Sequence, residues 1–202
     1  MLSFKMEITG IKEATRFLND FQKKQIPFAV ATALNETANQ ARDEIVKHLQ
    51  SSFTLRTGWW KPRTRYGINV QPAKKTSLVS EVFTKAPWMG LQETGGIKAP
   101  RGKNIAVPSP YVKRSKRDLI TQANRPRNLK NSFIGRSKSG QETIFQRIGR
   151  GKNRVIRAMY FLEKRAEIKP AFQFAQTAQR VANERWAKNF AKALDFALRT
   201  AK

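Results

Sequence analysis

Cysteine is absent from this 202-residue chain, and histidine occurs only once. Without thiols the chain can form no disulfide, thiolate metal site or cysteine nucleophile. No apolar run approaches the roughly 20 residues that cross a bilayer. The first ten residues also lack the apolar core and cleavage site of a signal peptide. We therefore expect a protein that is made in the cytoplasm and has no membrane partner.

Acidic residues are scarce, at 14 Asp+Glu against 40 Lys+Arg, which leaves a formal net charge of +26. Self-repulsion of this size opposes compaction unless a polyanion or an acidic partner neutralises it. The cations do not gather on one face of an amphipathic helix, which disfavours a membrane surface. The charge therefore favours nucleic acid as a partner.

Hydrophobic periodicity in the first quarter of the chain predicts a strand followed by helices. Residues 2–8 alternate between apolar and polar side chains, as in a half-buried strand, and residues 11–21 have the spacing of a short amphipathic helix. A longer helix is predicted from about 27 to 51, with Pro27 in its first turn. Its apolar stripe is formed by Ala31, Leu34, Ala38, Ala41, Ile45 and Leu49.

A second long helix is predicted over about 170–199, after Pro170. Its stripe is formed by Ala175, Ala178, Ala182, Trp186, Phe190, Ala193 and Ala197. Because both stripes are rich in alanine, they can approach a neighbour closely, and we expect them to offer surfaces for assembly with other subunits.

The centre of the chain, about 55–168, alternates short β-branched or aromatic segments with Gly and Pro, which predicts strands. The predicted strands are 66–70, 78–83, 104–107, 133–134, 143–148 and 155–162. Helices at both ends and a strand-rich centre define an α+β fold. We expect one domain that covers residues 1–202.

Most of the net charge lies in this centre, because residues 55–165 hold 26 Lys+Arg and only 5 Asp+Glu. The cations concentrate in loops, where they can contact phosphates without reading base sequence. No recognition helix, zinc finger or aromatic RNA-binding motif is present. An ordinary basic surface, or contact with acidic protein faces, remains an alternative. The candidate nucleic-acid-facing residues are Lys98, Arg101, Lys103, Lys113, Arg114, Lys116, Arg117, Arg125, Arg127, Lys130, Arg150, Lys152 and Arg154.

Catalysis is not indicated, and we predict no catalytic, cofactor-binding or metal-binding residue. His48 lies on the flank of the first long helix without a proton-transfer partner in the sequence. The glycines of residues 149–152 lack the spacing of a phosphate-binding loop and favour a β-turn. Trp59, Trp60 and Trp88 could stack on bases, but tryptophans in loops more often anchor them to a core or a neighbouring subunit.

Four stretches of the chain resemble the minor tail protein Z and tail-completion family of tailed phages. The resemblance covers most of residues 26–198, depends on the order of the stretches, and does not include residues 119–140. The stretches are IPFAVATALNE (26–36); FTLR (53–56) with GINV (67–70) and LVSEVF (78–83); LQETGG (91–96) with IAVP (105–108); and YFL (160–162) with IKP (168–170) before the last helix.

This resemblance implies a virion protein of the tail or neck that acts late in tail assembly and makes the tail competent to join the DNA-filled head. It further implies a homo-oligomeric ring, with six copies matching the symmetry of the tail. The implied partners are other tail and head–tail connector proteins and packaged double-stranded DNA, bound without sequence specificity.

Two other functions stay open at this point. A cytoplasmic protein that binds nucleic acid nonspecifically would share the charge but act as a monomer or dimer. A nuclease would need its few acidic residues, such as Glu93 or Glu142, to be assembled around a metal from distant loops.

Overall fold

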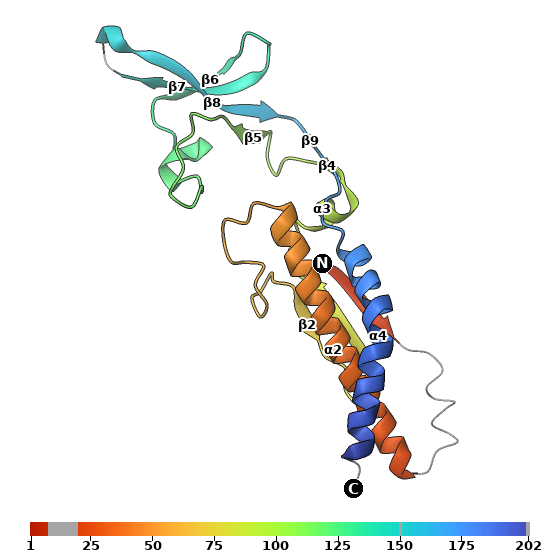
Figure 1. Cartoon of the computed structure of the whole chain (residues 1–202). Coiled ribbons are helices and arrows are strands. Elements are labelled where there is room, and N and C mark those ends of the chain that lie inside the picture. The colour runs from red at the N-terminus through yellow and green to blue at the C-terminus, as the bar shows by residue number, and fades with distance from the viewer. Residues whose placement is uncertain (8–19, 150, 201–202) are drawn as a thin grey trace. The chain divides into compact units, whose positions relative to one another are not determined.

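The computed structural model describes residues 1–7, 20–149 and 151–200 (Figure 1). It confirms the α+β class, with a long helix in the N-terminal half and another at the C-terminal end. The chain divides into two compact units, which we call unit 1 (residues 1–94 and 170–202) and unit 2 (residues 95–169). The single domain expected over residues 1–202 stays a prediction.

Unit 1 contains a three-stranded antiparallel sheet with the order β1-β3-β2, where β1 is Leu2–Glu7, β2 is Asn69–Gln71 and β3 is Val79–Thr84. The alternation predicted for the first strand is confirmed from Leu2 to Met6, and Met6 is buried in the core. The strand expected at 66–70 instead begins at Asn69. Residues before it form a turn, in which the Gly67 amide donates to the Thr64 carbonyl oxygen at 3.2 Å.

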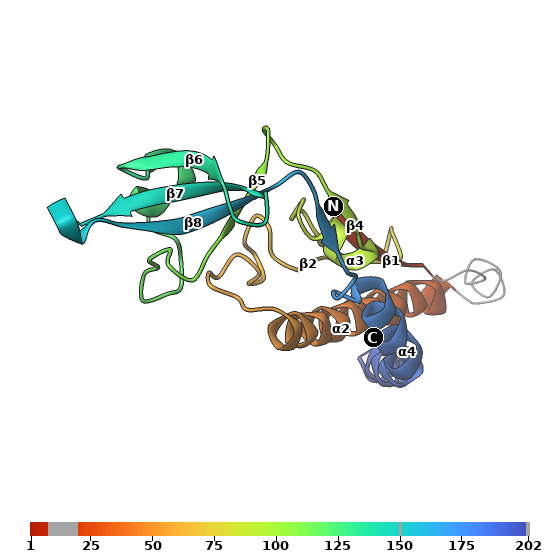
Figure 2. The same ribbon diagram turned by 90° about the horizontal axis from the view of Figure 1, so that it is seen from above.

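The two long helices of unit 1 are α2, Asp20–Ser52, and α4, Phe174–Arg199, and they run side by side (Figures 1 and 2). The predicted start of the first helix near Pro27 is wrong, because Pro27 lies inside α2. Proline lacks an amide hydrogen and costs an intrahelical hydrogen bond. Ile26 and Val30, which lie on either side of Pro27 in the sequence, pack in the core of unit 1. The short helix expected over 11–21 falls mainly outside the described residues.

The apolar stripes of α2 and α4 form the core of unit 1. All six predicted stripe residues of α2 are buried, and the α4 stripe buries Ala178, Ala193 and Ala197. Ala29 and Ala33 of α2 form a separate buried cluster with Ala193 and Ala197, so small side chains let the two helices approach closely. The stripes therefore pack within unit 1, and the expectation that they serve as surfaces for other subunits is wrong.

The start of α4 is attached to α3, Gly90–Thr94, through backbone and side-chain hydrogen bonds. The amides of Ala171 and Phe172 donate to the Gln92 carbonyl oxygen at 2.8 and 2.9 Å. The amides of Phe174 and Ala175 donate to the two carboxylate oxygens of Glu93 at 2.7 and 2.9 Å. The two bonds to Glu93 satisfy amide donors that the first turn of a helix leaves unpaired.

Unit 2 contains a four-stranded antiparallel sheet with the order β5-β8-β7-β6. The strands are β5, Ile105–Pro108; β6, Ser132–Arg136; β7, Glu142–Ile148; and β8, Val155–Glu163. They confirm the four strands predicted in this region. Two further strands, β4 (Gly96–Lys98) and β9 (Ala166–Ile168), pair with each other and were not predicted. Each spans only three residues, too few to show a period.

The core of unit 2 is small. Its buried residues are Val112, Leu129, Ile144, Met159 and Tyr160. Residues 119–140, which the resemblance does not cover, contribute Leu129 and the half-buried Ile120 to this core, and they also contain β6. This stretch is therefore a structural part of unit 2.

Candidate nucleic-acid interface

Positive charge is distributed unequally between the two units. Unit 2 carries 20 Lys+Arg against 4 Asp+Glu, whereas unit 1 carries 20 against 10. The predicted candidates all fall in unit 2. All of them except Arg150, which lies outside the described residues, have exposed side chains.

The loop at residues 113–117 is held by short-range hydrogen bonds. The Ser115 amide donates to the Leu119 carbonyl oxygen at 2.8 Å, and the Asp118 amide donates to the Ser115 carbonyl oxygen at 2.9 Å. Arg114 forms an ion pair with Asp118 at 3.5 Å. Arg114 is therefore partly neutralised by its own loop, in contrast to its neighbours Lys113, Lys116 and Arg117.

Hydrogen bonds to backbone carbonyl oxygens fix the loop at residues 125–130. It contains a 3-10 turn at Pro126–Asn128, and the Asn128 side-chain amide donates to the Gln122 carbonyl oxygen at 2.9 Å. The hydroxyl of Tyr160 in the core donates to the Asn124 carbonyl oxygen at 2.5 Å. Burial raises the pKa of Tyr160, and the charge of Arg114 opposes this shift. The hydroxyl therefore stays a donor at neutral pH, and the loop is fixed while its cations face solvent.

The loop at residues 149–154 connects β7 to β8. Gly149 has a φ of +90°, and a Cβ at this position would lie 2.4 Å from the Asn153 carbonyl oxygen, so the turn requires glycine. A 3-10 turn at Gly151–Asn153 follows. The β-turn predicted at residues 149–152 includes Arg150, which lies outside the described residues, and Lys152 and Arg154 are exposed.

Eleven of the thirteen candidates have no carboxylate within 4 Å in the part of the chain that the structure describes. The exceptions are Arg114, which is paired with Asp118, and Arg150. In unit 1, by contrast, Arg42, Lys47, Arg180 and Arg199 each contact a carboxylate oxygen at 2.6–3.2 Å. Unit 2 therefore presents cations that are available to an external anion.

Other exposed cations of unit 2 were not among the candidates because they lie on or next to strands. Arg147 lies over the ring of Phe133 at 4.1 Å, and Arg157 lies over the ring of Tyr111 at 5.2 Å. Arg136, Lys164 and Arg165 lie at strand ends. The charge excess of residues 55–165 includes these cations, but the candidates were chosen only from the Lys/Arg-rich loops.

The residues tested as catalytic candidates have structural partners. Glu93 caps α4 through two backbone amides. Glu142 accepts a hydrogen bond from the Asn104 side-chain amide at 3.1 Å. His48 Nε2 lies 3.2 Å from the Ala171 carbonyl oxygen, beside the start of α4. Among the described residues no group of three His, Cys, Asp or Glu could hold a metal ion.

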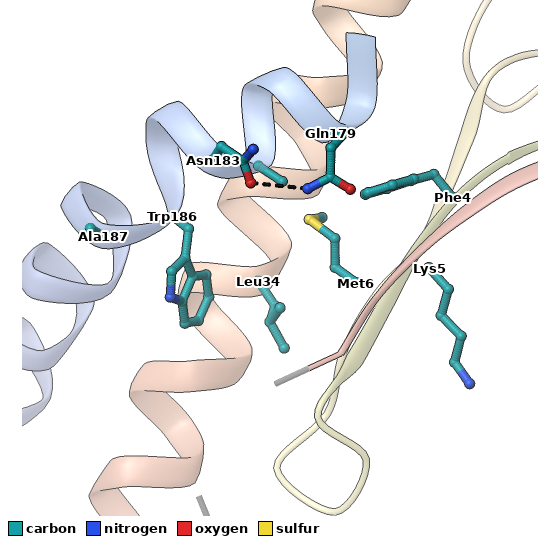
Figure 3. A pocket seen from close by; sticks show the side chains of 9 residues that line it. Phe4, Lys5, Met6, Leu34, Gln179, Asn183, Trp186 and Ala187 are labelled. Atoms are coloured by element: carbon teal, nitrogen blue, oxygen red, sulfur yellow. Dashed lines mark hydrogen bonds between the residues drawn. The ribbon is translucent and has the colours of Figure 1, made fainter. Parts of the chain in front are cut away.

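An apolar cavity of about 460 Å³ lies in unit 1 between β1, α2 and α4 (Figure 3). Met6, Leu34 and Trp186 contribute apolar surface, and the Gln179 amide donates to Asn183 at 2.9 Å on its α4 side. The side chain of Lys5 extends away from these residues (Figure 3). The cavity thus contains no pair of groups suited to acid–base chemistry.

Trp59 and Trp60 contact the core of unit 1, whereas Trp88 is 43% exposed and contacts other aromatic rings. Trp59 and Trp60 are half-buried against this core. Trp88 meets the ring of Trp59 edge-on, with centroids 5.3 Å apart, and the ring of Tyr66 at 5.0 Å. These contacts agree with the anchoring role preferred from the sequence.

The fold and the surface define an α+β protein with one strongly basic unit. The family model of prophage minor tail protein Z matches residues 8–202, and the chain belongs to this family. It is therefore a tail protein of the virion. Comparison with curated proteins and with solved structures finds no match. No helix in the described part of the chain is long and apolar enough to span a bilayer.

Proposed function

We propose that this chain is a ring-forming tail-completion subunit that is needed for head–tail joining and that lies in the neck of the particle. The basic loops of unit 2 contact packaged double-stranded DNA through its phosphates. In a ring, for which the family resemblance suggests six copies, these loops line the channel, and other tail and connector proteins contact the remaining surface.

The observation that carries this proposal is the set of eleven exposed candidate cations without a carboxylate partner in the described residues. Like charges gathered on one small unit repel one another unless counter-charge is supplied from outside. DNA supplies it at high density and without any need for base readout. The hydrogen-bonded loops at 113–117 and 125–130 also favour this role, because their cations are presented on a fixed backbone.

A phage that lacks the gene for this chain tests the assembly role. We expect complete heads and complete tails that fail to join, and joining should return when the wild-type chain is supplied in trans. Normal infectious particles from the deletion would contradict the proposal. Electron microscopy of the lysate distinguishes these outcomes directly.

The ring is tested on the purified protein. Light scattering after size-exclusion chromatography in high salt should give a mass several times 23.1 kDa, and negative-stain images should show closed rings. A monomer or dimer that keeps tight RNA binding would instead favour the alternative function of a cytoplasmic nucleic-acid-binding protein.

A further inference from the structure

A basic pocket lies at one end of the four-stranded sheet of unit 2, where β5 and β7 begin and β6 and β8 end. We call it the sheet-end pocket. It has a volume of about 890 Å³. Four separate stretches of the chain contribute to it, and its charged lining residues are Lys103, Arg136, Glu142, Glu163, Lys164 and Arg165.

The two carboxylates of the sheet-end pocket are occupied by neutral amides. Glu142 accepts from the Asn104 side chain at 3.1 Å, and Glu163 accepts from the Gln141 side chain. Glu142 is the direct cross-strand partner of Arg136, yet the two side chains form no ion pair in the described structure. Each carboxylate thus has an amide partner, and neither forms an ion pair with a pocket cation in the described structure.

The four cations of the pocket are exposed, and none has a carboxylate within 4 Å among the described residues. Four cations against two carboxylates leave the lining of the pocket with a net charge of +2, which attracts an anion. Arginine adds a planar fork that matches two oxygens of a phosphate, and lysine supplies a point charge. The pocket contains two arginines and two lysines.

A second depression, of about 420 Å³, adjoins the sheet-end pocket. It is lined by Arg125 and Arg127 from the predicted interface, and both depressions are lined by Asn104. Two cations of the 125–130 loop and four of the pocket are therefore brought next to the same residue. This continuity suits a ligand that carries several phosphates in a row.

We propose that the sheet-end pocket binds consecutive phosphodiester groups of DNA. The proposal rests on the DNA-facing role proposed above for unit 2 and adds a site to it. Lys103 is the one pocket cation among the predicted candidates. Arg136, Lys164 and Arg165 are added by the structure.

The test compares two variants of the full chain that lose the same charge. Arg136→Gln with Arg165→Gln removes two pocket cations, and the control, Arg147→Gln with Arg157→Gln, removes two arginines of β7 and β8 that lie over aromatic rings outside the pocket. Binding to a labelled 20-base-pair duplex is measured by fluorescence anisotropy across a salt series. Each lost phosphate contact lowers the salt slope by about 0.9. We expect the pocket variant to lose about two units of slope and the control variant less than one.

Equal losses in the two variants would overturn the pocket and leave a diffuse basic surface, with the proposed function intact. A wild-type protein without salt-dependent DNA binding would instead overturn the DNA contact itself. Circular dichroism spectra that match the wild type show that the variants fold.

Two further ligands identify the chemistry of the site. Pyrophosphate should shift the side-chain amide signals of Asn104 and Gln141 in NMR spectra, and the duplex should displace it. Shifts that the duplex does not reverse would assign the pocket to a small free anion and overturn the DNA assignment. Poly-glutamate that binds as tightly as DNA and is lost in the pocket variant would assign it to an acidic protein partner, with the same consequence.

Discussion

The two units of this tail protein differ in what stabilises them. Unit 1 has a core built from two long helices and a sheet, with α2 residues such as Leu34, Ile45 and Leu49 at 0–1% exposure. The hydrophobic core of unit 2 contains five buried residues in the described part of the chain, and the unit carries 20 Lys+Arg against 4 Asp+Glu, compared with 20 against 10 in unit 1. Burial of apolar surface is the main favourable contribution to folding. The comparison indicates that unit 1 supplies most of the stability, and it agrees with the proposal that unit 2 binds DNA.

Removing core volume from unit 1 should have the largest effect. Ile45→Ala deletes a fully buried side chain between α2 and its neighbours, and we expect a loss of about 2–5 kcal/mol in the free energy of unfolding. The matched control is Ile156→Ala in unit 2, where the side chain is 55% exposed and the loss should stay within about 0.5 kcal/mol. Urea unfolding followed by circular dichroism measures both, and similar losses would contradict the contrast between the units.

Removing unpaired cations from the 113–117 loop should weaken DNA binding without affecting stability. We expect Lys116→Ser with Arg117→Ser to lower the salt slope by about two units. Between 50 and 200 mM salt the affinity of this variant should therefore fall by a factor roughly tenfold smaller than that of the wild type. The matched control, Lys47→Ser with Arg180→Ser, removes two cations of unit 1 that already have carboxylate partners. An unchanged slope in the loop variant would assign those side chains to acidic protein neighbours.

Removing the cap of α4 should cost stability but not binding. Glu93→Ala leaves the amides of Phe174 and Ala175 without their carboxylate partner, for an expected loss of about 1–2 kcal/mol. Thermal unfolding measures the loss, and the DNA salt slope should not move. If the wild type cleaved DNA with a metal and this variant did not, Glu93 would be catalytic and the structural role would be wrong.

The smallest expected effect concerns an ion pair of unit 1. A hydrogen bond from Lys47 lowers the pKa of Glu44 below its ordinary value of 4.5. Since the folded-state pKa is lowered, the pair stabilises the protein above pH 4.5, and this contribution is lost as the pH falls through the folded-state value. Both side chains are well exposed, so Lys47→Gln should cost about 0.3 kcal/mol at pH 7 and nothing near pH 2. Urea midpoints at the two pH values measure the difference.

Much of the fold could be predicted because the signals were local. The six residues of the α2 stripe follow a helical period, and the structure buries all of them. The strands β5 to β8 all begin within one residue of their predicted positions, although β6 extends to Arg136 instead of ending at 134. The predicted helix start was wrong because proline prefers the first turn of a helix, whereas α2 begins at Asp20 and contains Pro27. The three-residue strands β4 and β9 carried no detectable period.

The candidate interface was predictable as a region but not as a set of contacts. Residues 55–165 were identified by charge, which requires only counting. The roles of Arg114 and of the carboxylates required knowledge of neighbours. Arg114 differs from Lys116 only through its contact with Asp118, and Glu142 meets Asn104 only through the fold.

By itself the sequence determined the element types, the α+β class and the concentration of positive charge in the centre, since periodicity and composition act over neighbouring residues. Only the tertiary structure decided which charges face solvent without a partner and which groups meet. Glu93 caps a helix 81 residues away, and four stretches of unit 2 form one basic pocket. Such contacts depend on chain reversal and strand register, which are set by packing of the whole unit rather than by any local pattern.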